Sequence, residues 1–519
     1  MCRVTRLFRP TDQLVRTLLA PVLVFVATCM DRNYQTDLWH HLARGRVLIE
    51  EGVLLNSDRF TYTVSDEPFR DVNWGWQAAF YLLYRVGGIS LVQLANSAIL
   101  ALTFGLLGAL ASRKCRSPVI AAIACVTAFL GLWPLLIIRP QTFSLLLFVG
   151  LQCILNAAAH RTAWLVAAPL VMASWVNVHG GFPIGLVLIA ANGVAVTAEA
   201  ALKAASQRLL TCLRASTPFW ICLAVSALAT LANPYGWHVY EYVGLTSARA
   251  STRHIDEWLP PGLDSLTGKM FAISIAASVL LLALARKKPI LRDAIVACCF
   301  LPLACGSVRM VAWWFLAWTP FFAELLEAAC PQLTEADAGD NDSSRSAAFS
   351  CVLLIAAAIF SLPYLERMNP VFLLPGRAHR TESDLQEAVD QIARHAQGRV
   401  FTRFAWGEYV EWALDGRGSV FMDGRIEIYP DEVWDQYAAI TRGRADWQQL
   451  LDSYGVDCLL LDDSGYDGQL IAFVSKSNAW NEVFRKGNAV LFLRNSSVEN
   501  IGPLTRRAMP PNLRAEAGN

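Results

Sequence analysis

Residues 89–112 read ISLVQLANSAILALTFGLLGALAS, an apolar run of 24 residues without one charged side chain. A helix needs roughly 20 such residues to cross the hydrocarbon of a bilayer. The rest of the chain has the same character, because 55% of its 519 residues are hydrophobic and only 17% are charged. A soluble core does not need so much apolar surface. The sequence therefore predicts a polytopic α-helical membrane protein.

Similar apolar runs recur along the chain and predict about eleven membrane-spanning helices. They fall near residues 14–30, 89–112, 118–138, 142–159, 163–178, 182–199, 217–233, 268–285, 290–307, 310–329 and 347–364.

Lysine and arginine cluster at every second junction between these runs, near residues 3–9, 113–116, 161, 203–214 and 286–288. Cytoplasmic loops are enriched in these residues. We therefore expect a cytoplasmic N-terminus, and an odd number of spans then places everything after about residue 365 outside. The alternative, a cleaved signal peptide at residues 16–30, lacks the usual small-residue cleavage site.

Four regions are expected. Residues 1–365 form the membrane domain, whose first outer loop is residues 31–88. Within it, residues 330–346 are polar and Gly/Ser-rich and predict a flexible cytoplasmic linker. Residues 366–495 alternate helical and strand patterns, which predicts an extracytoplasmic α/β domain. Residues 496–519 predict a disordered tail.

Composition also excludes several classes of function. The 44 Lys and Arg residues nearly balance the 43 Asp and Glu residues, so the basic field that nucleic-acid binding requires is missing. The sequence contains neither a GxGxxG motif after a strand nor a Walker-type loop, which argues against an ATP-driven pump. Most of the 13 cysteines fall in predicted spans, so no disulfide framework is expected.

The first outer loop contains DLWHHLARGR, residues 37–46. If this segment is helical, Asp37 and His41 stand on one face, with Trp39 and Arg46 nearby. A carboxylate beside the bilayer favours a functional role for Asp37. Three interpretations of His41 remain open: a metal ligand, a general base held by the carboxylate, or a ring stacked under Trp39.

Other polar residues collect at the same predicted outer ends of the spans. They are Arg139, Asn177, His179, Asn233, Glu257 and Arg309. Such groups are costly at the membrane boundary unless they pair or line a hydrated cavity, so their concentration on one side predicts one site there.

Simpler interpretations of the same residues stay open. Asn177 and Asn233 could end helices, and His179 could pack or donate a hydrogen bond. Arg139 and Arg309 could clamp a lipid phosphate, or their side chains could extend to lipid headgroups. In the C-terminal domain, Asp423-Gly424-Arg425 could be a turn, or Arg425 could bind the acceptor.

Several of these segments together resemble a known family. They are Asp37, Trp39, His41, Gly45 and Arg46; Asp58-x-Phe60-Thr61-Tyr62-Thr63; Asn73-Trp74 with Gln77; Arg139-Pro140-Gln141; Trp175-x-Asn177-x-His179-Gly180-Gly181; Asn233-Pro234-Tyr235-Gly236; Glu257-Trp258-x-Pro260; and Asp423-Gly424-Arg425. This set is similar to the bacterial GT-C superfamily glycosyltransferases, the group of the protein O-mannosyltransferases and the aminoarabinose transferases that act on lipid A. The best motifs are those of poorly characterised bacterial members.

The resemblance implies a transferase of the bacterial inner membrane that uses a polyprenyl-phosphate-linked sugar and a glycan, lipid or protein acceptor. It places the general base of the first outer loop at Asp37, with Asp58 among the substrate-binding residues. The mannosyltransferases have Asp-Glu at this place, whereas Leu38 follows Asp37 here. No cofactor is therefore firmly implied, and a divalent cation is left open.

Two other classes of function compete with the transferase. A transporter or flippase of lipid-linked intermediates predicts ionisable residues in mid-span and broken helices in paired halves. A noncatalytic membrane assembly protein predicts a first outer loop that can change without loss of function. The clustering of charged residues at one face favours the transferase.

Overall fold

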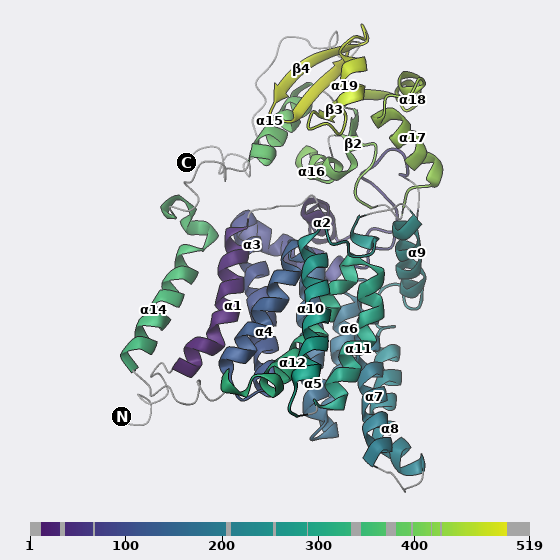
Figure 1. Cartoon of the computed structure of the whole chain (residues 1–519). Helices are drawn as coiled ribbons and strands as arrows, with labels where there is room; N and C mark the ends of the chain where they lie inside the picture. The colour runs from purple at the N-terminus through teal and green to yellow at the C-terminus, as the bar shows by residue number, and fades with distance from the viewer. Residues whose placement is uncertain are drawn as a thin grey trace. The chain divides into compact units, whose positions relative to one another are not determined.

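The structure is a computed structural model that describes residues 12–31, 37–65, 68–203, 209–252, 256–287, 289–333, 344–369, 380–395, 398–416, 418–425 and 428–495 (Figure 1). The chain forms two compact units. The helical unit comprises Met1–Ser57 and Pro68–Ala378, and the sheet unit comprises Asp58–Glu67 and His379–Asn519. The tail 496–519 and residues 334–343 of the expected linker lie outside the described residues.

The helical unit has a helix in each of the eleven apolar stretches (Figure 1). These helices are α1 (Asp12–Met30), α3 (Trp74–Ser112), α4 (Pro118–Leu132), α5 (Gln141–Ala158), α6 (Ala167–Val176), α7 (Pro183–Lys203), α8 (Leu209–Ala229), α10 (Leu266–Leu284), α11 (Leu291–Gly306), α12 (Val311–Ala329) and α14 (Ser344–Phe360). Among the described residues, six helices are long and apolar enough to cross a membrane, namely α1, α3, α4, α5, α7 and α10. The chain is thus a mostly helical membrane protein, while the count of eleven spans stays a prediction.

Helix α12 forms the centre of the helical unit. Every residue from Val311 to Ala323 is buried, because α12 packs against α3, α4, α10 and α11. Two tryptophans on it donate their indole N–H groups to α10: Trp314 to Ser274 Oγ at 2.9 Å and Trp318 to Ser278 Oγ at 2.7 Å. These bonds satisfy the polar tips of otherwise apolar rings.

Helix α3 is broken just before the apolar run that begins at residue 89. The helix is interrupted at Gly87 and Gly88, and Gly88 has a φ of 62°, which glycine adopts without a steric penalty. The part before the break carries polar residues of the outer loop, and the part after it is the apolar span. The break therefore separates the loop from the membrane segment.

Short elements connect the long helices. They are α2 (Asp37–Arg46), η1 (Val47–Glu51), η2 (Trp133–Leu135), η3 (Thr162–Val166), α9 (His238–Thr252), η4 (Asp256–Trp258), η5 (Val308–Met310) and η6 (Pro363–Met368). Three of them, α2, η4 and η5, carry the polar side chains described below.

The sheet unit is a small α/β domain, as the sequence predicts. Its five strands are β1 (Arg399–Thr402), β2 (Ser419–Val420), β3 (Val456–Asp462), β4 (Trp480–Lys486) and β5 (Ala489–Arg494), in the order β2-β1-β3-β5-β4. The β1 strand pairs parallel with β2 and β3, while β5 pairs antiparallel with β3 and β4. Its helices are α15 (Arg380–His395), α16 (Phe404–Leu414), α17 (Asp431–Thr441), α18 (Trp447–Ser453) and α19 (Gly468–Val474).

One segment of the first outer loop belongs to the sheet unit. Residues 58–65 lie beside β2, the strand at one end of the sheet order, and Thr61 pairs parallel with Val420. The Tyr62 amide donates to Val420 O and the Val420 amide donates to Phe60 O, both at 3.2 Å. The segment thereby extends the sheet by one short strand-like piece. No pattern in the sequence predicts that this part of the first outer loop joins the sheet unit.

Candidate functional site

The segment at residues 37–46 is a helix, α2, and Asp37 is its first residue. A carboxylate in the first turn is stabilised by the partial positive charge of the helix N-terminus. Residues Leu38 to Gly45 are all buried, whereas the side chain of Asp37 is 39% exposed. Asp37 is therefore the residue of α2 that combines a fixed position with access to solvent or substrate.

Arg139 lies between two carboxylates from distant parts of the helical unit. Its Nη1 is 3.6 Å from Asp37 Oδ2 and donates to Glu257 Oε1 and Oε2 at 3.0 and 3.1 Å. The Arg139 side chain is 5% exposed, and Glu257 is 34% exposed. Pro140 follows Arg139 just before α5, and Glu257 lies in η4. We call Asp37, Arg139 and Glu257 the Arg139 cluster.

The pKa values of the two carboxylates in this cluster are shifted in opposite directions. Burial raises the pKa of Asp37 above its usual value, and the charge of Glu257 raises it further, although Arg139 and Arg309 pull in the other direction. Burial would also raise the pKa of Glu257, but Arg139 and Arg309 outweigh it and lower that pKa. Asp37 is therefore more basic than an ordinary aspartate, which suits a proton acceptor, and Glu257 is the charged partner of Arg139.

Two neighbours complete the electrostatic surroundings of the cluster. The guanidinium of Arg309, in η5, lies 5.4 Å from the centre of the Trp258 ring. Ser307 Oγ donates to the backbone oxygen of Glu257 at 2.9 Å, which ties η4 to the residue that precedes η5. Arg309 is thus held close enough to contribute positive charge to both carboxylates.

His179 is held as a neutral ring. Its Nδ1 accepts from the Gly181 amide at 3.1 Å and lies 2.8 Å from Ser144 Oγ, which in turn accepts from Trp175 Nε1 at 2.7 Å. A ring nitrogen that accepts from an amide places the proton on Nε2. Burial, together with the charges of Arg309 and Arg139, holds the pKa of His179 well below its usual value. Its Nε2–H is therefore available as a hydrogen-bond donor.

His41 belongs to a second network on α2. Gln77 Nε2 is 3.1 Å from His41 Nδ1 and donates to Asp71 Oδ1 at 2.8 Å. Asp71 also lies 3.8 Å from Arg44 Nη1. Burial, followed by His40 and Arg44, holds the pKa of His41 well below its usual range. The contact with Gln77 adds a fourth interpretation of His41 to the three above, a neutral ring that orients α2.

The sequence analysis missed three residues of these networks, Arg44, Asp71 and Ser144. Each is at most 3% exposed. Polar residues that are buried need partners, but a single sequence cannot say which of its many polar residues are buried. Nothing in the local sequence around these three residues distinguishes them from polar residues at the surface.

Asn177 and Asn233 hold loops together. Asn177 Oδ1 accepts from Trp74 Nε1 at 3.1 Å, and its Nδ2 donates to Ala232 O at 2.7 Å. Asn233 Oδ1 accepts from the Tyr235 amide at 2.7 Å. These bonds account for both asparagines in the loops that follow α6 and α8.

The other two candidates on α2 occupy different environments. Trp39 is 9% exposed and contributes to the core. Arg46 ends the helix, at the opposite end from Asp37, and is half-buried. The structure therefore brings Asp37, Arg139, Glu257, Arg309 and His179 into one electrostatic neighbourhood, and leaves Arg46 at a distance along the helix.

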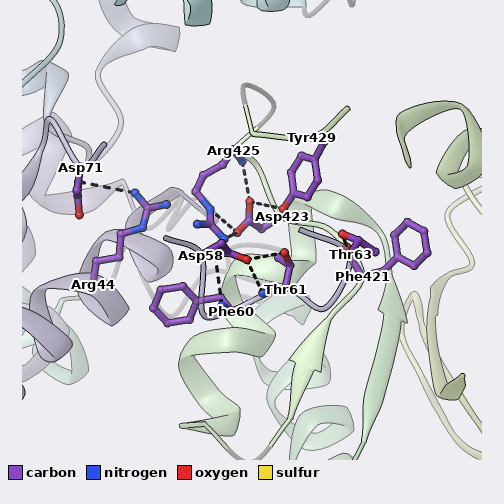
Figure 2. A network of polar contacts seen from close by, with 10 residues as sticks. All are labelled: Arg44, Asp58, Phe60, Thr61, Thr63, Asp71, Phe421, Asp423, Arg425 and Tyr429. Atoms are coloured by element: carbon purple, nitrogen blue, oxygen red, sulfur yellow. Dashed lines mark hydrogen bonds and ion pairs between the residues drawn. The ribbon is translucent and has the colours of Figure 1, made fainter. Parts of the chain in front are cut away.

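Asp58 and Arg425 lie in the sheet unit and contact each other (Figure 2). Arg425 Nη2 is 2.6 Å from Asp58 Oδ1, and Arg425 Nε donates to Asp423 Oδ2 at 2.6 Å. Asp423 Oδ1 accepts from Tyr429 OH at 2.9 Å and from the Arg425 amide at 2.8 Å. We call Asp58, Asp423 and Arg425 the Arg425 cluster. Its members are at most 3% exposed, so their partners are within the protein.

The divalent cation left open by the sequence does not fit the Arg139 cluster. Arg139 already supplies a positive charge between Asp37 and Glu257, in the place where a metal ion would otherwise balance two carboxylates. Within the described ranges, His, Cys, Asp and Glu side chains form no group of three or more that could hold a metal ion.

Comparison with solved structures identifies the fold. The archaeal oligosaccharyltransferase AglB from Archaeoglobus fulgidus, in complex with an inhibitory peptide and a dolichol-phosphate, is 12% identical with a TM-score of 0.54, covering 94% of this chain and 74% of its own. An Archaeoglobus fulgidus oligosaccharyltransferase tethered with an acceptor peptide has a TM-score of 0.52 at 12% identity, covering 91% of this chain and 73% of its own. ArnT from Cupriavidus metallidurans in the apo state has a TM-score of 0.51 at 15% identity, covering 94% and 98%.

These similarities define the class of fold. The chain has the fold of the GT-C glycosyltransferases, as its sequence resemblance implied. No protein-family model matches the chain, and no curated protein matches it in sequence. The fold alone is established by such distant similarity, and the activity is argued from the site.

Proposed function

We propose that the protein is a membrane glycosyltransferase that moves a sugar from a polyprenyl-phosphate donor to an acceptor on the extracytoplasmic side. The observation that carries this proposal is the Arg139 cluster, in which a partly exposed carboxylate of raised pKa starts the helix of the first outer loop. The fold supports it, because both AglB and ArnT share that fold and AglB binds a dolichol-phosphate in one of its structures.

The proposed reaction is a single displacement at the anomeric carbon. The acceptor hydroxyl or amine gives its proton to Asp37 while its lone pair forms the new bond to that carbon. The carbon–oxygen bond to the phosphate breaks, and polyprenyl phosphate leaves with the electron pair. Because the donor already carries a good leaving group, the protein needs to position the acceptor, accept one proton and balance phosphate charge.

The surrounding residues have matching roles in this proposal. Arg309 and the Nε2–H of His179 supply positive charge and a donor for the leaving phosphate, and neutral His179 can donate without changing its own charge. Arg139 and Glu257 keep Asp37 in place and set its basicity. His41, Gln77 and Asp71 fix the rotation of α2.

The test is sugar transfer by the purified full chain from a panel of synthetic polyprenyl-phosphate sugars to a panel of glycan, lipid and peptide acceptors. We expect transfer from at least one donor, and its loss in Asp37→Asn with donor binding retained. Asp264→Asn is the matched control, because it removes an exposed carboxylate of the same unit and is expected to transfer normally. Donor binding without turnover by the native chain across both panels would contradict the proposal and favour transport or assembly.

A further inference from the structure

The sheet unit holds residues 58–65 by backbone and side-chain contacts together. Besides the two amide bonds to β2, Thr63 Oγ1 donates to Phe421 O at 2.6 Å. The Tyr62 ring packs edge-on against Phe421, with ring centres 5.8 Å apart. Every one of these contacts joins residues more than 350 positions apart in sequence. The segment is therefore bound as a foreign strand would be.

A buried ion cluster fixes the beginning of the segment (Figure 2). Asp58 Oδ2 accepts from the Thr61 amide at 2.9 Å and from Thr61 Oγ1 at 2.6 Å, while Asp58 Oδ1 faces Arg425 Nη2 at 2.6 Å. Oδ1 also accepts from the Phe60 amide at 3.3 Å, so both oxygens of Asp58 support the local turn and one of them pairs with Arg425. Removing Arg425 would leave Asp58 and Asp423 buried without a counter-charge, which is strongly destabilising. Removing the charge of Asp58 would break the ion pair between the segment and Arg425, while Arg425 would keep its pair with Asp423.

Both ends of the segment are fixed in the helical unit. Ser57 and Pro68 form an antiparallel bridge, and the Phe69 amide donates to Asn56 O at 2.8 Å. We call residues 56–57 and 68–69 the neck. On one side, residues 52–55 connect the neck to η1 and α2. On the other side, Asp71 lies three residues after Pro68. Its carboxylate accepts from Gln77 Nε2, and the same nitrogen contacts His41 of α2. The neck thus lies between the segment 58–65, which the sheet unit holds, and the residues that order α2.

We propose that Arg425 is a positioning residue for the transfer reaction, acting through Asp58 and the first outer loop on the helix that carries Asp37. This inference rests on the proposed function. In this proposal the sheet unit restrains the first outer loop, and the restrained loop keeps Asp71 beside Arg44 of α2. Arg425 itself touches neither donor nor acceptor.

The experiment compares Arg425→Met, Asp58→Asn and the double variant in the full chain, reconstituted in lipid nanodiscs. Hydrogen exchange of residues 58–63 and 419–422 reports the held segment, and initial rates give kcat and the donor KM. We expect amide protection of the segment to fall by on the order of a hundredfold in each single variant. We expect kcat to fall at least about tenfold with donor KM changed less than about threefold. The double variant should be no worse than the singles, because the residues act as a pair.

Two further variants separate positioning from general damage. Thr63→Val removes one hydrogen bond and leaves the ion cluster intact, so we expect a decrease of only a few-fold in both readouts. Arg485→Met removes an arginine of β4 that pairs with Asp463 and Glu482 at the surface and is 40% exposed, and it should change neither. The sheet unit counts as folded in a variant when the β3 amides still exchange more slowly than amides of an unfolded chain, even where their protection is reduced.

Three results would overturn the inference. Unchanged protection of residues 58–63 in Arg425→Met would mean that the ion cluster does not hold the segment. Lost protection with full kcat would mean that the segment is held without any effect on the reaction. A native chain that transfers no sugar would remove the proposed function and the positioning role with it, whereas the protection data would still report the docking of the segment separately.

Discussion

The molecule places an arginine between two carboxylates twice, once in each unit. In the Arg139 cluster the carboxylates are 39% and 34% exposed, and the contact to Asp37 is 3.6 Å long. In the Arg425 cluster Asp58 and Asp423 are fully buried, and Arg425 lies 2.6 Å from Asp58. Asp37 is thus loosely paired and accessible, whereas both carboxylates of the Arg425 cluster are tightly paired and buried. Accessibility thus separates a site poised for chemistry from one that holds structure.

Removing each arginine should have a different main effect, and the largest effect on catalysis is expected at Arg139. Arg139→Met leaves Asp37 and Glu257 without their shared cation, so Asp37 loses its position and its charge balance. We expect kcat/KM for sugar transfer to fall by about 10²–10³-fold. Initial-rate kinetics on the purified variant measures this. A loss of less than about fivefold would mean that Arg139 only stabilises the fold.

Arg425→Met should mainly lower the stability of the sheet unit, in addition to its smaller effect on kcat. The change leaves Asp58 and Asp423 buried without a counter-charge, which costs about 3–5 kcal/mol. Hydrogen exchange of β3 and β5 as a function of denaturant gives this free energy of unfolding. An equal destabilisation in Arg139→Met would erase the distinction between the two clusters.

The pH dependence sharpens the role of Glu257. Asp37 acts as a base only when ionised, so transfer should fall as the pH drops through its raised pKa. The charge of Glu257 contributes to that raised pKa. In Glu257→Gln we therefore expect the acid limb of the kcat/KM profile to move to lower pH, by roughly one unit or less. A move to higher pH would contradict the assignment of Asp37 as the titrating group.

The smallest expected effect is that of metal removal. Because Arg139 supplies the cation between Asp37 and Glu257, dialysis against EDTA should change the transfer rate by less than about twofold. Rates measured before and after adding back Mg²⁺ or Mn²⁺ test this. Loss of transfer that a divalent cation restores would show that the cluster recruits a metal.

Much of the fold was predictable because its signals are local. Each apolar run coincides with a helix, and the alternating patterns of residues 366–495 predict the α/β domain. Such features depend on neighbours in sequence, through hydrophobic periodicity and the length of a bilayer span.

The pairings were not predictable, because they join positions far apart in sequence. Glu257 is 118 positions from Arg139, and Asp58 is separated from Arg425 by most of the chain. In both cases the residue type indicated a polar site, but only tertiary structure decides which charges meet. Asp71 and Ser144 stayed hidden for the same reason, since nothing in their local sequence signals burial.

The central claim is that Asp37 accepts the proton of the acceptor. The most direct measurement is the single-turnover rate of Asp37→Asn at saturating donor, with donor affinity and thermal midpoint measured on the same preparation. The account predicts a rate lowered by about 10²–10⁴-fold, with donor affinity and thermal midpoint close to those of the native chain. A rate within tenfold of the native chain, at unchanged donor affinity, would contradict it.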